Sequence, residues 1–284
     1  MDTLSDLLSR PLPPYLYHYT SVSGLHGIIE SETIWASMIH YLNDAEEFRI
    51  AITVFRGMLL EESIRIGDGQ LQRLAAQLVE SLASLSRVFI CVCSFTGEGD
   101  LLSQWRAYCP SDGGYSIGFL SEPLKKSLSD QAFDLIPCVY DQEGHRRVMG
   151  PIVQKALSSL QMVAKTKYGS GDLVAKWEEF DFVRSFCRIA PIIKHESFRE
   201  EQEWRAISGL LGTHQLEFRP GRSLLVPYYK VKLHRQITLK IVVGPQRHSD
   251  LAAKSLENFL LKKVVERDLP FERPQISRIP LRQL

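Results

Sequence analysis

The densest group of chemically active side chains lies between residues 194 and 205, in the segment KHESFREEQEWR. Glu201 and Glu203 share one face if this segment is extended, because side chains alternate along a strand. The apolar residues that follow predict a strand beginning near Gln202. A carboxylate at the end of a strand, beside aromatic residues, is well placed to have a raised pKa or to stabilise a cation. The alternative, a solvated charged turn, is equally open.

A histidine stands between two tyrosines in the short aromatic segment Tyr15–Thr20. On a strand, the two tyrosines face away from His18, which shares its face with Thr20. A run of small and polar residues follows, so we expect His18 at a strand end that a ligand reaches. The alternative is a satisfied, partly buried histidine, which the pattern alone favours.

The segment from residue 100 to 108 predicts one or two helical turns with Trp105 and Tyr108 on the same face. Rings at this spacing favour packing in the core. The alternative is an aromatic wall against a planar ligand. The sequence leaves both roles open, with packing as the favoured one.

Gly114, Ser116 and Gly118 match the G-x-S-x-G pattern of the nucleophile elbow, in which a strand-to-helix turn exposes the serine. The surrounding residues argue against an elbow, because a turn cluster precedes the motif and a strand pattern contains it. We therefore expect a glycine-bearing strand over 115–120 and rank a serine hydrolase last among the candidate functions.

Asn43, Asp44, Glu46 and Glu47 place three carboxylates within four residues, a grouping suited to a divalent metal. A helix start also attracts carboxylates through its dipole, and Asn43 with Glu46 has capping-box spacing. We favour capping and expect no metal in this protein.

The composition excludes several classes of protein. The chain has 284 residues, of which 44% are hydrophobic and 24% charged, with a formal net charge of +1. These values are typical of a globular protein rather than a fibrous or disordered one, and the balanced charge argues against a dedicated duplex-DNA binder. No apolar stretch approaches the about 20 residues that cross a bilayer, and no secretory signal is visible. The odd number of cysteines is a poor disulfide framework and favours the cytoplasm.

The order of patterns predicts an α+β protein with many short strands and clustered helices. We expect a loose N-terminal arm over 1–14, then one domain over 15–284 with a helical insertion at about 141–187. The expected strands are 15–20, 33–37, 88–95, 115–120, 133–140, 188–194, 203–208, 214–218, 224–233, 238–243 and 273–279. The expected helices follow residue 21, open at residue 43, and cover about 71–85, 100–108, 144–166, 172–186 and 249–265.

Several separated motifs, taken in order from about residue 15 to 246, resemble the bacterial DUF2971 family, whose function is unassigned. The motifs are Tyr17 to Thr20, Ile34 to Ser37, Leu42 to Asp44 with Glu47 to Arg49, Cys93 to Phe95, Leu102 to Trp105 with Tyr108, Gly114 to Phe119, Lys194, Phe198, Glu201, Glu203 to Arg205, and Ile241 to Pro245. The layout is also similar to the ADP-ribosyltransferase fold, which implies a split mixed sheet with flanking helices.

The resemblance to ADP-ribosyltransferases implies NAD as the substrate and assigns roles to particular residues. Glu203 would stabilise the oxocarbenium-like transition state and contact a ribose hydroxyl. Glu201 would orient or activate the acceptor, and His18 would bind the ribose on the adenosine side. Further contacts would come from Tyr19, Thr20, Ser37, Trp105, Arg106, Tyr108, Tyr115, Lys194 and Arg205.

The resemblance leaves the stacking aromatic residue, the middle tyrosine and the pyrophosphate-binding cation open among several residues. Trp105, Tyr108 or Tyr115 would stack on the nicotinamide, and Tyr41, Tyr108 and Tyr115 all qualify as the middle tyrosine of the superfamily pattern. Arg106, Arg205 or Lys194 would hold the pyrophosphate. The Glu201-x-Glu203 spacing is similar to the group that uses Arg, Ser and Glu, whereas His18 is similar to the group that uses His, Tyr and Glu.

The expected function is therefore that of a cytoplasmic bacterial enzyme acting on NAD. It would transfer ADP-ribose to a protein or nucleic acid, or hydrolyse NAD, as a toxin or a phage-defence effector. The alternative is a non-catalytic module on the same fold that binds a nucleotide, a nucleic acid or a protein. We expect no membrane partner, and the sequence does not indicate an oligomeric state.

Overall fold

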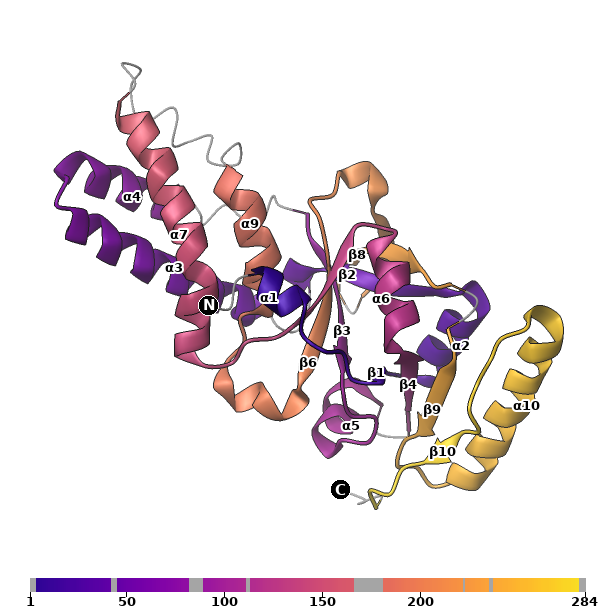
Figure 1. The fold of residues 1–284 in the computed structure, drawn as a ribbon. Helices are drawn as coiled ribbons and strands as arrows, with labels where there is room; N and C mark the ends of the chain where they lie inside the picture. Colours follow the sequence, from indigo (N-terminus) through magenta and orange to yellow (C-terminus); the bar gives the residue numbers. More distant parts are fainter. Residues whose placement is uncertain are drawn as a thin grey trace.

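The computed structural model describes residues 4–41, 45–81, 89–110, 113–165, 181–221, 223–234 and 237–280. In these residues ten strands form one open sheet with helices at both of its sides (Figure 1). The strands are β1 (Tyr15–Thr20), β2 (Thr33–Met38), β3 (Cys91–Thr96), β4 (Tyr115–Leu120), β5 (Phe133–Pro137), β6 (Glu203–Ser208), β7 (Glu217–Pro220), β8 (Leu225–Lys232), β9 (Leu239–Val243) and β10 (Gln275–Ile276). Paired strands are antiparallel except for β9 and β10. The predicted α+β class and mixed sheet are confirmed.

The sheet is split beside β3. The strand order is β10-β9-β4-β1-β3-β2-β8-β7, and β6 pairs with both β3 and β5. β6 follows β3 over five residues, so β1 and β2 must share the remaining edge. β1 meets that edge at Thr96, whereas β2 meets it at Cys91 and Val92. β1 and β2 therefore separate along the middle of β3.

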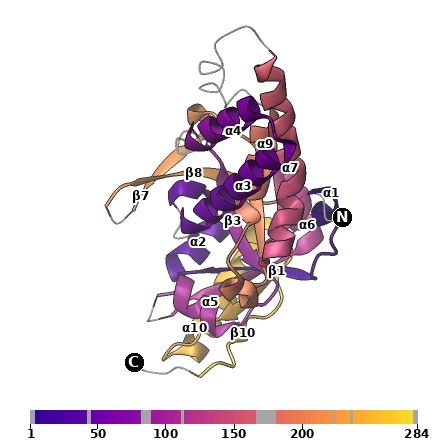
Figure 2. The same cartoon turned by 90° about the vertical axis from the view of Figure 1, so that its left-hand side faces the viewer.

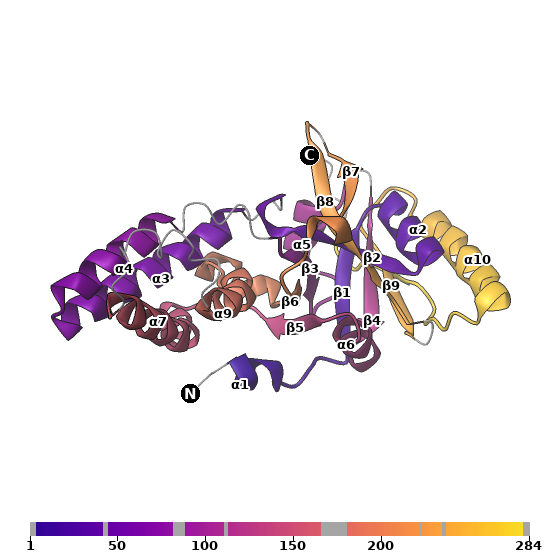
Figure 3. The ribbon, with the colours of Figure 1, turned by 90° about the horizontal axis from the view of Figure 1, so that it is seen from above.

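Four helices form a layer beside the sheet, seen most clearly from above (Figure 3). They are α3 (Ala45–Ile66), α4 (Gly69–Ser81), α7 (Gln142–Ala164) and α9 (Asp181–Ile189). Their buried apolar side chains, among them Phe55, Leu157 and Phe186, form one core. The predicted insertion at about 141–187 accounts only for α7 and α9. The segment 45–81 supplies the other half of the layer, because its long helices bury their apolar faces against α7.

The remaining helices lie around the sheet. They are α1 (Leu4–Leu8), α2 (Val22–Ser31), α5 (Leu102–Tyr108), α6 (Ser121–Ser129) and α10 (Ser249–Arg267). Helix α2 begins where a helix was expected, after residue 21, and Ser21 caps it, with its side chain accepting a hydrogen bond from the backbone N–H of Gly24. The predicted loose arm contains α1, whose Leu7 is fully buried in the helical core. Helix α6 was not predicted, since it buries only two leucines, Leu124 and Leu128.

Several other predictions differ from the structure. The predicted strand 188–194 is the end of α9 and a 3-10 turn, Ala190–Ile192, because a short apolar run does not distinguish a buried helix from a buried strand. A 3-10 turn, Thr213–Gln215, occupies the start of the predicted strand 214–218. Asn43, Asp44, residues 82–88 and residues 166–180 lie outside the described residues, so the predicted caps and ends there stay predictions.

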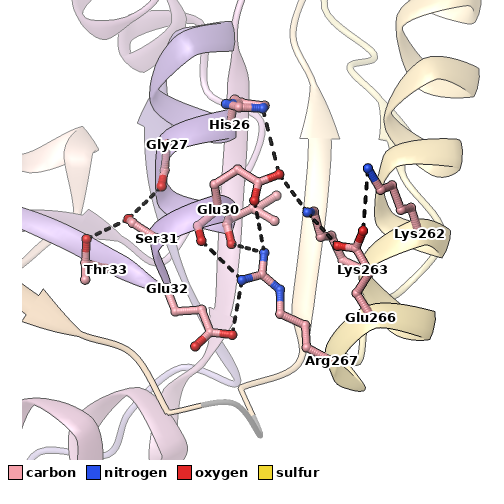
Figure 4. Close-up of polar contacts among 11 residues, drawn as sticks. His26, Gly27, Glu30, Ser31, Glu32, Thr33, Lys262, Lys263, Glu266 and Arg267 are labelled. Carbon is pink, nitrogen blue, oxygen red and sulfur yellow. Dashed lines mark hydrogen bonds and ion pairs between the residues drawn. The ribbon is translucent and has the colours of Figure 1, made fainter.

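Helix α10 is attached to α2 by a group of ion pairs (Figure 4). Arg267 donates hydrogen bonds to the backbone carbonyls of Ile29 and Glu30, which belong to the last turn of α2, where carbonyls lack helical partners. Lys263 lies 2.7 Å from Glu30 and 2.8 Å from Glu266. These contacts hold the end of α10 against the last turn of α2.

Replacing Arg267 with alanine is expected to lower the free energy of unfolding by about 1–3 kcal/mol, because partly buried carbonyls lose their charged donor. The measurement is the urea midpoint. Arg273→Ala is the matched control: Arg273 is 85% exposed in its ion pair with Glu257, and such surface pairs contribute about 0–1 kcal/mol. Equal midpoints for the two variants would contradict the anchoring role of Arg267.

Candidate functional site

A cleft of about 570 Å³ lies at the split in the sheet. It is lined by β1, β2 and β3, by residues of α2 from Ser23 to Ile28, and by Glu201 and Glu203 at the start of β6. His18 and the acidic pair Glu201 and Glu203 line this same cleft, although more than half of the chain separates them. The other predicted site residues that line it are Tyr19, Thr20, Ser37, Tyr41 and Tyr108.

His18 has a defined hydrogen-bonding state. Its Nδ1 atom lies 3.0 Å from the backbone carbonyl oxygen of Ser94. A carbonyl only accepts, so Nδ1 carries the proton, and Nε2 is an acceptor in the neutral ring. Burial lowers the pKa of His18 and outweighs the opposing effect of the Ser94 hydrogen bond. At neutral pH, the ring is therefore uncharged and offers one acceptor.

The acidic pair is brought together by a tight turn. Glu201 ends a 3-10 helix, Gln202 adopts the left-handed conformation with φ of 43°, and Glu203 begins β6. The ammonium of Lys194 lies 2.6 Å from Glu201 Oε2 and also donates to Glu203 Oε2. The two carboxylates thus lie close together, through the turn and Lys194 rather than through the extended backbone that we expected.

Glu203 is fixed by two buried cations. Arg205 donates from Nε to Oε1 at 2.7 Å and from Nη2 to Oε2 at 3.1 Å. Burial alone would raise the pKa of Glu203, but the charges of Arg205 and Lys194 lower it to about 2. The expectation of a raised pKa is wrong for this residue, because both cations lie beside it.

The three cations predicted to hold a pyrophosphate do not line the cleft. Lys194 and Arg205 are each 1% exposed, are absent from the cleft lining, and direct their charges to the carboxylates. Arg106 is exposed on α5 and is also absent from the lining. All three side chains therefore lie outside the lining of the cleft, and their assignment to a pyrophosphate stays a prediction. Arg219, on β7, lines the cleft instead; no motif in the sequence distinguished it.

The aromatic candidates divide into two groups. Trp105 is buried, meets Tyr19 edge to face at 4.6 Å between ring centroids, and donates from Nε1 to Asp100 at 2.8 Å. Tyr115 is buried and absent from the cleft lining. The prediction that Trp105 packs in the interior of the protein is confirmed. Tyr41 and Tyr108, by contrast, line the cleft with 42% and 37% of their surface exposed.

The G-x-S-x-G segment is part of a strand. Ser116 lies fully buried within β4, so the predicted strand is confirmed and an exposed nucleophile is excluded. A Cβ on Gly118 would lie 2.5 Å from the ring of Tyr17, and one on Gly114 would lie 2.9 Å from the carbonyl oxygen of Thr20. Both glycines serve close packing beside β1.

Within the described part of the chain, no group of three or more His, Cys, Asp or Glu side chains is arranged to hold a metal ion. None of the described helices combines the length and apolar character needed to cross a bilayer.

Comparison with known proteins gives one match. Residues 104–206 match the model of a family described as a protein of unknown function, DUF2971. The matched segment contains β4, β5 and the acidic pair, and it supports the resemblance to this family over the middle of the chain. No curated protein and no solved structure matches the chain.

The charge of Glu203 predicts a pH dependence of stability. Folding lowers its pKa from 4.5 to about 2, so its ionised form stabilises the protein above about pH 4.5, and this contribution is lost as the pH falls toward 2. We expect the urea midpoint of the wild type to fall more steeply over this range than that of Glu203→Gln.

The variant Glu203→Gln should also lose about 3–5 kcal/mol at neutral pH, because the buried cations lose a partner. Glu200→Gln is the control, since Glu200 is exposed beside the same turn, and it should keep the wild-type profile. A Glu203→Gln profile parallel to that of the wild type would show that Glu203 does not titrate as described.

Proposed function

We propose that the cleft binds NAD and that the protein cleaves the bond between nicotinamide and ribose. The observation that carries this proposal is that His18 and the pair Glu201 and Glu203 line one cleft. The size of the cleft is within the range of about 300–1,000 Å³ typical of small-molecule sites. The similarity to the ADP-ribosyltransferase layout adds support.

The reaction needs no redox step. The bond from ribose C1′ to the nicotinamide nitrogen breaks, and its electron pair stays on nicotinamide. C1′ then bonds to an oxygen of water or to a nucleophile of a macromolecule, which releases one proton to solvent. Positive charge develops on the ribose in the transition state, as in glycoside hydrolysis. A fixed anion stabilises that charge without reorganising.

Glu203 would be this fixed anion. Three hydrogen bonds from Arg205 and Lys194 hold its carboxylate, and a carboxylate offers about four acceptor positions. The fourth would accept a hydrogen bond from a ribose hydroxyl. Glu201, whose side chain is more exposed than that of Glu203, would orient or activate the acceptor.

The residues around His18 would hold the adenosine side of NAD. Nε2 of the neutral His18 accepts a hydrogen bond, so a ribose hydroxyl is a suitable donor. Thr20 and Ser37 add polar groups to the lining, and Tyr41 and Tyr108 add exposed rings for the planar nicotinamide or adenine. A cytoplasmic bacterial toxin or phage-defence effector is the setting that the resemblance suggests.

One observation favours the alternative of a binding module without turnover. Lys194 and Arg205 balance the charges of Glu201 and Glu203, so the field that stabilises a developing cation is weaker than that of a lone carboxylate. A module of this kind would bind the nucleotide and release no nicotinamide.

Nicotinamide release from NAD tests the proposal. The double variant Lys194→Met with Glu203→Gln removes one charge of each sign, which keeps the buried charges balanced. We expect it to fold, by circular dichroism and urea midpoint, and to release nicotinamide at least about 100-fold more slowly than the wild type.

The matched control is Glu200→Gln, which should keep the wild-type rate. The proposal fails if the wild type releases no nicotinamide above the buffer background, or if the folded double variant is as fast as the wild type. Calorimetric binding of NAD without release would establish the binding module instead.

A further inference from the structure

Arg219 is a cation of the cleft that no carboxylate neutralises among the described residues. It is the only Lys or Arg in the cleft lining of the described chain, and no ion pair involves it there. It lies on β7, in the β7–β8 hairpin that extends away from the rest of the sheet (Figures 2 and 3). The hairpin thus brings a positive charge to a cleft whose other charges are paired.

The hydrogen bonds of Arg219 are incomplete. Its Nη2 atom donates to Ser37 Oγ at 3.2 Å, whereas its Nε atom is buried without a hydrogen-bond partner. A buried charged donor without a partner is unfavourable. An oxygen of an anionic ligand would supply the missing acceptor, and a guanidinium is well suited to bind a phosphate through two donors at once.

The carboxylates near Arg219 are already engaged. Glu217, two residues earlier on β7, is held by Lys230 and by the hydroxyl of Tyr228. Glu201 and Glu203, which also line the cleft, are held by Lys194 and Arg205. The negative charges of the site are therefore compensated, and the charge of Arg219 is available to a ligand.

An aromatic ring lies beside this cation. The guanidinium carbon of Arg219 is 5.9 Å from the ring centroid of Trp35. Trp35 lines the cleft, is 44% exposed, and is supported by Tyr228 at 4.4 Å between centroids. A supported and exposed ring offers a stacking surface for a planar base. A base and a phosphate would thus bind side by side.

We propose that Arg219 and Ser37 bind the phosphates of a nucleoside diphosphate moiety whose base stacks on Trp35. The choice of this ligand class rests on the proposed function, because NAD contains two linked phosphates between its nucleosides. The anion site itself rests on Arg219 and its surroundings.

Calorimetry with ADP and adenosine, at low salt, tests the phosphate contact. The wild type should bind ADP at least about tenfold more tightly than adenosine, since a charge-assisted contact of this kind is typically worth that factor or more. Arg219→Ala should remove the difference, and the control Arg56→Ala, an exposed residue on α3, should keep it. Equal ADP preference in Arg219→Ala, or no binding of ADP by the wild type, would overturn the proposal.

A separate variant tests whether the base stacks on Trp35. Trp35→Leu should weaken ADP and adenosine by a similar factor, and unchanged adenosine affinity would overturn the role of Trp35. The experiments distinguish failure of the proposed NAD cleavage from failure of the proposed anion site at Arg219. Arg219-dependent binding of ADP without nicotinamide release leaves the anion site standing alone, whereas NAD cleavage with Arg219-independent ADP binding leaves only the cleavage.

Discussion

The site depends on the sharing of one edge of β3 by two strands. β6 occupies the other edge, so β1 and β2 bond to opposite ends of the remaining one. The backbone between those ends needs other partners, because buried carbonyls are rarely left without a donor. His18 supplies one by donating to Ser94. The same hydrogen bond fixes the tautomer that gives the cleft its acceptor.

The second constraint is the burial of four charges at the cleft. Lys194, Arg205, Glu201 and Glu203 carry balanced charge, and each would be unfavourable if buried alone. Arg205 also donates to the carbonyl of Pro191, which joins β6 to the 3-10 turn after α9. Folding of the helical layer and placement of the acidic pair are thereby coupled. The acids are held in one orientation, which suits both a fixed electrostatic role and tight binding.

Sequence patterns anticipated the parts of the site that depend on local periodicity. The alternation around His18 predicted β1, the apolar residues after Glu203 predicted β6, and a helix was expected after residue 21, where α2 begins. Partnerships between distant side chains were not accessible in this way. Lys194 and Arg205 have the residue types of phosphate ligands, and only the fold reveals that carboxylates neutralise them. Arg219 carries no motif, because its position depends on the pairing of β8 with β2 and of β7 with β8.

One ligand should contact both His18 and Glu203, which line the same cleft. A crystal structure of the protein with ADP-ribose tests it most directly. In that structure, a hydroxyl of one ribose should lie within hydrogen-bonding distance of His18 Nε2, and the other ribose should lie beside the carboxylate of Glu203. ADP-ribose bound outside the cleft, or in contact with only one of these two side chains, would contradict it.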